Sequence, residues 1–143
     1  MKDGNTADEA GPDALPEGMR IRLDQLRRKL LHLHKILLDA ERAAYERKHG
    51  RKTAGEVLQL LINHEQFAWL HRISGLVVRI DEILEDEEPS TGTNAAILLT
   101  NARSLLTPAE NGDDFGKKYH DALQRQPDAV LAHKDVAAIL SDG

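Results

Sequence analysis

The segment from Leu60 to Leu84 carries residue types that often bind metal ions or transfer protons. His64, His71 and Asp81 follow one another along a stretch with helical periodicity. Two ligands on a helix share one metal ion when they are three or four residues apart, because these positions lie about one turn from each other. His64 and His71 are seven residues apart, so roughly 10 Å of helix separates them. This spacing favours an amphipathic helix that carries histidines over a metal site.

Other chemical motifs are incomplete. A di-iron carboxylate bundle needs Glu-x-x-His on two helices, and the clearest copy here runs from Glu46 to His49 without a second. The chain has no cysteine, which excludes a thiolate zinc site and a cysteine nucleophile. It also lacks Gly-x-Ser-x-Gly, Ser-x-x-Lys and the glycine-rich phosphate-binding loops. We therefore predict no metal, no cofactor and no catalytic residue, and an enzymatic activity is the less expected outcome.

Asp81 is the acidic residue in the most unusual position. It falls between Val77 and Leu84 on the apolar face of its helix, where an unpaired carboxylate is costly to bury. The favoured interpretation is a structural carboxylate, bonded to an Arg, His or Tyr of the first long helix. The alternative is a general base that opens onto a polar pocket together with other side chains. The candidate residues for that pocket are His34, Tyr45, Ser74 and Asp81.

The elements that would position these residues are helices. From Met19 onward, Leu and Ala recur at alternating steps of three and four, which predicts one long amphipathic helix that ends near Gly50. Leu31, Leu38 and Tyr45 form a second apolar row, so this helix should touch more than one neighbour.

Capping patterns mark the next boundaries. Thr53 and Glu56 form a capping box before a short helix, and Asn63 resembles a second cap of this type. Further helices are expected from about His64 to Asp86, from about Asn94 to Leu106, around Phe115–Leu123 and from Pro127 to Leu140. No segment alternates as a strand does.

These patterns predict an all-α fold: a single-domain bundle of four main helices plus one or two short helices. Residues 1–17 are expected to be a flexible acidic tail, and residues 18–143 to form the bundle. No apolar run approaches the ~18 residues that a membrane span needs, and the N-terminus has no apolar signal region. The sequence therefore indicates a cytoplasmic protein without membrane association.

Charge is distributed unevenly along the chain, whose formal net charge is -5. Residues 20–52 hold eleven Lys and Arg against four acids, whereas residues 53–88 hold two against eight. This asymmetry suits a basic–acidic pairing of the first helix with the His64–Asp86 helix, antiparallel to it, with Trp69 buried against Leu30–Leu37. Nucleic-acid binding is unlikely, since aromatic residues are scarce and the whole chain is acidic.

Two segments, "LHKILLDAERAAYERKHG" and "FAWLHRISGLVVRIDEIL", together with "VLAHKDV" near the end, resemble a group of small bacterial proteins of unassigned function. The resemblance covers roughly residues 33–84. The residues that carry it are His34, Asp39, Glu41, Arg42, Tyr45, Phe67, Trp69, Ser74, Asp81 and His133. It implies a helical bundle in a bacterial cytoplasm and brings no activity with it.

The expected function follows from the abundance of amphipathic helices and the shortage of chemical motifs. We expect a non-enzymatic helical module that interacts with a protein partner or with itself, forming an oligomer. The alternative is a bundle that binds a small ligand or a metal in the polar pocket named above.

Overall fold

The computed structural model describes residues 15–86, 91–108 and 112–141, and these ranges contain helices and no strand. The elements are α2 (Glu17–His49), α3 (Ala54–Asn63), the 3₁₀ helix η2 (Glu65–Leu70), α4 (His71–Glu85), α5 (Thr91–Leu105), α6 (Asp114–Arg125) and α7 (Pro127–Ser141). The all-α prediction is confirmed. The helix lengths are roughly consistent with four main helices, α2, α4, α5 and α7, and two shorter ones.

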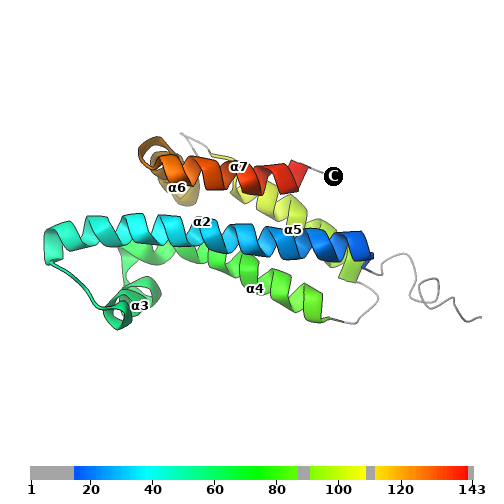
Figure 1. Cartoon of the computed structure of the whole chain (residues 1–143), viewed down its shortest axis with the longest axis horizontal. Coiled ribbons are helices and arrows are strands. Elements are labelled where there is room, and N and C mark those ends of the chain that lie inside the picture. Colours follow the sequence, from blue (N-terminus) through cyan, green and yellow to red (C-terminus); the bar gives the residue numbers. More distant parts are fainter. Residues whose placement is uncertain (1–14, 87–90, 109–111, 142–143) are drawn as a thin grey trace, which may run out of the picture.

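The 33-residue helix α2 is the axis of the molecule, with α4 along one side and α7 along the other (Figure 1). Arg20 of α2 contacts Leu84, Arg27 contacts Asp81, and Glu41 contacts Trp69. Positions that rise along α2 thus meet positions that fall along α4, so the two helices are antiparallel, as predicted. Helix α3 lies beside the C-terminal end of α2.

The core is built on the apolar seam of α2. Five leucines spaced by three and four residues are fully buried there, and the other helices supply the side chains packed around them. The buried α2 residues are Leu23, Leu26, Leu30, Leu33 and Leu37. The second row is less buried than this seam, since Leu31 is 43% exposed while Leu38 and Tyr45 pack only partly against the core. Helix α2 nevertheless contacts more than one neighbour, α4 and α7, as predicted.

Local sequence signals set most helix ends. Gly50 has a φ of 84°, a conformation that favours glycine, and its amide donates to the Glu46 carbonyl. Thr53 and Glu56 form the predicted capping box at the start of α3. The second cap was predicted at Asn63, and this is wrong. The capping residue is His64, whose Nδ1 accepts a hydrogen bond from the Gln66 amide at 3.0 Å.

The predicted helix from His64 to Asp86 is therefore two elements. Its first part is the 3₁₀ helix η2, which buries Phe67, Trp69 and Leu70, and the α-helix begins only at His71. At the N-terminus, α2 starts at Glu17 and Leu15 packs against the core, both inside the expected tail. Residues 1–14 of that tail lie outside the described residues. Within the described ranges, no helix combines the length and the apolarity needed to cross a bilayer.

Candidate functional site: a groove between α4 and α5

A polar stripe on α2 faces α4 and η2. It contains His34, a predicted site residue, and Arg27, the partner of the predicted site residue Asp81. Arg20, Arg27, His34 and Glu41 follow one another at intervals of seven. The Arg20 guanidinium donates to the Leu84 carbonyl at 2.7 and 3.1 Å, which stabilises the C-terminal end of α4. Glu41 accepts hydrogen bonds from Trp69 Nε1 at 2.8 Å and from Gln66 Nε2 at 2.9 Å.

Asp81 pairs with Arg27 in this stripe. Arg27 Nε lies 2.6 Å from Asp81 Oδ1, so the partner is an Arg of the first helix, one of the possibilities that the sequence raised. The pair is not enclosed in the core, however, because the two side chains are 36% and 41% exposed. Asp81 therefore joins two helices at the surface of their interface, in the manner of a structural carboxylate.

His34 is the member of the stripe without a hydrogen bond to the described part of the chain. Its Nε2 is buried and has no partner there. Burial first, and then the nearby His71, lower the pKa of His34. The register set by Arg27 and Asp81 brings Ser74 opposite His34. Ser74 Oγ donates to the His71 carbonyl at 3.3 Å, and His71 Nε2 donates to the Leu61 carbonyl of α3.

Tyr45 lies away from these residues, eleven positions beyond His34 on α2, or roughly 16 Å of helix. Its ring packs on His49, His64 and Phe67, with centroids 4.2, 5.3 and 5.9 Å away. The structure thus places His34, Ser74 and Asp81 along one interhelical seam and Tyr45 past its end. None of the four lines a cavity described below.

Another polar pair joins α6 to α7. The Tyr119 hydroxyl lies 2.7 Å from His133 Nδ1, and Tyr119 is fully buried. Burial raises the pKa of Tyr119 and lowers the pKa of His133. Both shifts favour the neutral forms, and the tautomer of the imidazole decides which of the two groups donates. This internal hydrogen bond supplies the partner that spacing alone did not assign to His133.

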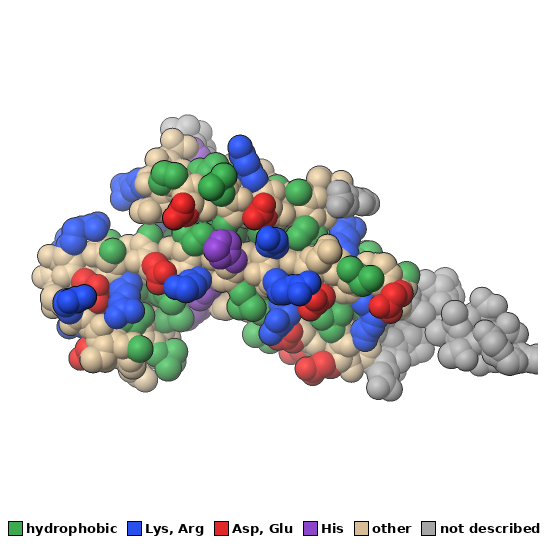
Figure 2. Space-filling view, in the orientation of Figure 1, with side chains coloured by type: hydrophobic (Ala, Val, Ile, Leu, Met, Phe, Trp, Pro, Cys, Tyr) green, Lys and Arg blue, Asp and Glu red, His purple; other side chains and the backbone are tan. Residues whose placement is uncertain are grey.

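Most basic side chains in the first half of α2 bind other parts of the chain. Arg22 donates to the carbonyls of Ile139 and Leu140 at the end of α7, and Lys29 lies 3.7 Å from Asp135 of the same helix. Arg28 and Lys35 pair with Asp24 and Asp39 one turn away. Figure 2 shows these charges of both signs interspersed along α2. Part of the basic segment thus joins α2 to other helices, whereas Arg28 and Lys35 pair within α2 itself.

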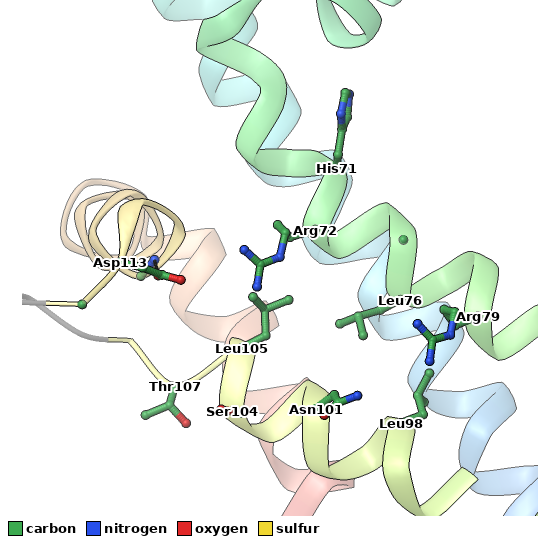
Figure 3. A pocket seen from close by; sticks show the side chains of 13 residues that line it. His71, Arg72, Leu76, Arg79, Leu98, Asn101, Ser104, Leu105, Thr107 and Asp113 are labelled. Atoms are coloured by element: carbon green, nitrogen blue, oxygen red, sulfur yellow. Dashed lines mark hydrogen bonds between the residues drawn. The ribbon is translucent and has the colours of Figure 1, made fainter. Parts of the chain in front are cut away.

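The largest cavity described is an open groove of about 890 Å³ between α4 and α5, closed at one end by the start of α6 (Figure 3). Two smaller cavities, of about 350 and 210 Å³, lie between α5 and α7 and between α2 and α6. The α4–α5 groove is lined by His71, Arg72, Gly75, Leu76, Arg79, Leu98, Asn101, Ser104, Leu105, Thr107, Gly112, Asp113 and Gly116.

Arg72 and Arg79 are the two arginines that line this groove along α4. They lie seven residues apart on one face of α4, and both side chains extend over the space in front of α5 (Figure 3). Arg72 sits over the Phe115 ring, 5.8 Å from its centroid, and neither arginine pairs with a carboxylate in the described ranges. A guanidinium in this state offers its fork of N–H donors to an incoming carboxylate or phosphate.

The space between the two arginines can admit a bulky group. Gly75 lies between them, and a Cβ added there would meet no atom within 4 Å. Leu76, Leu98 and Leu105 form the apolar part of the lining, while Asn101 and Ser104 add hydrogen-bonding groups. Asp113 brings a negative charge to the α6 end, where its Oδ1 accepts from the Gly116 amide at 2.8 Å. The groove therefore combines an apolar floor with one cationic rim, formed by α4.

This arrangement of cationic, apolar and amide side chains can bind a ligand that carries negative charge. Among the described residues, no group of three or more His, Asp or Glu is placed to hold a metal ion. The groove was not predicted from the sequence. The signal that would have found it is the pair of basic residues in the acidic segment 53–88, spaced by seven and separated by a glycine. That pattern puts two positive charges on one helix face beside an open position.

No protein-family model, curated protein or solved structure matches this chain. The resemblance to small bacterial helical-bundle proteins therefore stays a prediction from the quoted segments.

Proposed function

We propose that this protein is a non-enzymatic helical interaction module, and that its α4–α5 groove binds an acidic segment of a protein partner. The single observation that carries the proposal is the presence of two arginines on one rim of a groove of about 890 Å³, without a carboxylate partner in the described ranges. Arg20, Arg22 and Arg27, by contrast, bind carbonyl or carboxylate oxygens within the chain. Arg72 and Arg79 are thus free to recognise an oxygen ligand from outside.

The shape of the groove supports a helical segment as the ligand. Arg72 and Arg79 are about two helical turns apart, roughly 10 Å, with Gly75 and Leu76 between them. A helix with carboxylates seven residues apart and an apolar side chain between them matches this order of charge, apolar contact and charge. Amphipathic helices commonly bind in grooves through anchors at such spacings.

A second candidate is a small ligand with two negatively charged groups. The volume of the groove falls in the range of about 300–1,000 Å³ typical of small-molecule sites, and its arginines, Asn101 and Ser104 offer polar contacts. This is the ligand-binding alternative raised by the sequence, moved from the predicted pocket to a different site.

Fluorescence anisotropy with a labelled synthetic helix tests the proposal. The probe carries two glutamates seven residues apart with a leucine between them, and a matched peptide carries lysines in their place. We expect the acidic peptide to bind and the basic peptide not to bind. The variant with Arg72→Glu and Arg79→Glu should bind the acidic peptide at least about tenfold more weakly.

Two controls make the result specific. A protein with Lys48→Glu and Arg51→Glu has the same change in net charge outside the groove, and its affinity for the acidic peptide should stay close to that of the wild type. A small dicarboxylate such as succinate should compete only weakly with the peptide. Equal loss of affinity in both protein variants would overturn the proposal, and strong competition by the dicarboxylate would favour the second candidate.

A further inference from the structure

The outer face of α7 carries a stripe of side chains with the spacing that the α4–α5 groove requires. Asp128 and Asp135 are seven residues apart, Leu131 lies between them, and all three are exposed. Leu131 is 63% exposed, the highest value among the large hydrophobic side chains of the described residues. Figure 2 shows acidic and hydrophobic side chains alternating over α7. The outer face of α7 thus presents an exposed leucine between two acids.

The α7 stripe and the groove are complementary in the order of their groups. Along α4, the groove presents Arg72, then Gly75 and Leu76 three and four residues later, and then Arg79, seven residues after Arg72. The stripe presents an acid, a leucine and an acid at the same intervals along α7. Two helices side by side can match both charge pairs at once, because the rise per residue is the same in each. Leu131 would then lie over Leu76, beside the open position at Gly75.

We infer that the partner of the α4–α5 groove is a second copy of this chain, which inserts the Asp128–Leu131–Asp135 stripe of α7. The inference rests on the proposed function, since it names the occupant of the same groove. Among the possible acidic helices, the second copy is favoured because this chain itself carries the complementary stripe on an exposed face. Both partners are folded before they meet, so little conformational entropy is lost on binding.

Neighbouring charges select an orientation. Lys134 is exposed next to Asp135, and Asp113 lies at the Arg72 end of the groove. When α7 of the second copy runs antiparallel to α4, Asp135 meets Arg72 and Lys134 comes towards Asp113. The opposite direction would place Lys134 near Arg79. Asp135 also contacts Lys29 of its own chain at 3.7 Å, but both side chains are about half exposed, so this pair is weak and easily exchanged.

The contact joins two different surfaces, so the copy that contributes the groove keeps a free stripe and the copy that contributes the stripe keeps a free groove. Such heterologous contacts produce rings if the rotation closes and open chains if it does not. An interface of about two helical turns is small, so the association should be weak, dependent on protein concentration and weakened by salt.

Charge reversal on the two surfaces tests the inference. In one variant, Arg72→Glu and Arg79→Glu make the groove acidic, and in another, Asp128→Arg and Asp135→Arg make the stripe basic. Sedimentation velocity over a range of protein concentrations should show association of the wild type. Each variant alone should associate at least about tenfold more weakly, because its two surfaces then carry like charges. A mixture of the two variants should associate again, because the acidic groove of one accepts the basic stripe of the other.

A matched control uses a stripe of similar spacing on α2, formed by the exposed Glu17 and Ile21 and the half-buried Asp24. The variant with Glu17→Arg and Asp24→Arg should associate as the wild type does. Circular dichroism verifies that every variant is folded. A wild type that stays monomeric at all concentrations, or a mixture that does not recover association, would overturn the inference. If the wild type stays monomeric while the synthetic acidic helix still binds the groove, the proposed function stands and only the identity of the partner is wrong.

Discussion

Two groups of arginine side chains in this protein differ in the oxygens available to them. Arg20, Arg22 and Arg27 are directed at carbonyl or carboxylate oxygens of neighbouring helices. Arg72 and Arg79 line an open groove and pair with no carboxylate in the described ranges. The first group contributes to stability and the second is available for recognition. Substitutions in the two groups should therefore affect different measurements.

Asp81→Asn tests the structural role of the Arg27–Asp81 pair. Solvent screens a pair whose side chains are more than a third exposed, so the substitution should lower the free energy of unfolding by no more than about 1 kcal/mol. Urea denaturation of Arg27→Met, Asp81→Asn and the double variant gives the coupling between the two side chains. A loss above about 3 kcal/mol would indicate a buried carboxylate, which disagrees with this geometry.

His34 should make the protein less stable in mild acid. Its pKa is lowered in the folded state, by burial first and then by His71. Below the ordinary value of 6.5, the unfolded chain takes up a proton that the folded chain resists, so stability is full above this pH and falls as the pH decreases through it. His133 acts in the same direction. Denaturation between about pH 7.5 and 5.5 should show a shallower dependence for His34→Gln than for the wild type. An identical slope for both proteins would rule out this role of His34.

Trp69 should be the most costly core side chain of η2 to remove. It is 6% exposed, packs on Phe115 of α6 and donates to Glu41 of α2. Trp69→Ala should lower the free energy of unfolding by about 3–5 kcal/mol. Trp69→Phe keeps much of the packing and loses the hydrogen bond, so it should cost clearly less. Equal losses in the two variants would show that the Glu41 contact, and not packing, carries the effect.

At the scale of elements, the periodicity of α2, the glycine at its end and the Thr53 capping box could be predicted because each depends on residues close together in the sequence. The 3₁₀ helix η2 could not, since Trp69 and Phe67 continue an apolar pattern that an α-helix would share. The arginine contacts with helix ends were not predictable either. Their acceptors are backbone carbonyls, which every residue has, so no residue type marks Leu84 or Leu140 as a partner.

Removal of Arg22 tests whether such contacts hold a helix end. Its guanidinium donates to Ile139 and Leu140, and Arg103 of α5 also donates to Leu140 at 2.7 Å. Arg22→Met should destabilise the last turn of α7 by about 1 kcal/mol. Hydrogen exchange should quicken at the amides of the last turn of α7 and stay unchanged in its first turn. Unchanged exchange at both ends would mean that Arg103 alone suffices.

At the scale of the whole molecule, α2 organises the charge of the protein. The basic first half of α2 is directed at the C-terminal ends of α4 and α7, where helix dipoles are negative. Two surfaces lie outside these contacts. The α4–α5 groove has two arginines on one side, and the outer face of α7 carries Asp128, Leu131 and Asp135. The central claim is that Arg72 and Arg79 are the groups that recognise the partner.

Nuclear magnetic resonance of the arginine side chains tests this claim most directly. The Nε–H signals of Arg72 and Arg79 are assigned by single substitutions and followed while the acidic helical peptide, or more of the protein itself, is added. We predict that these two signals shift together and saturate, while those of Arg22 and Arg27, which bind oxygens within the chain, stay in place. Binding that shifts the signals of Arg22 and Arg27 and leaves those of Arg72 and Arg79 unchanged would contradict the claim.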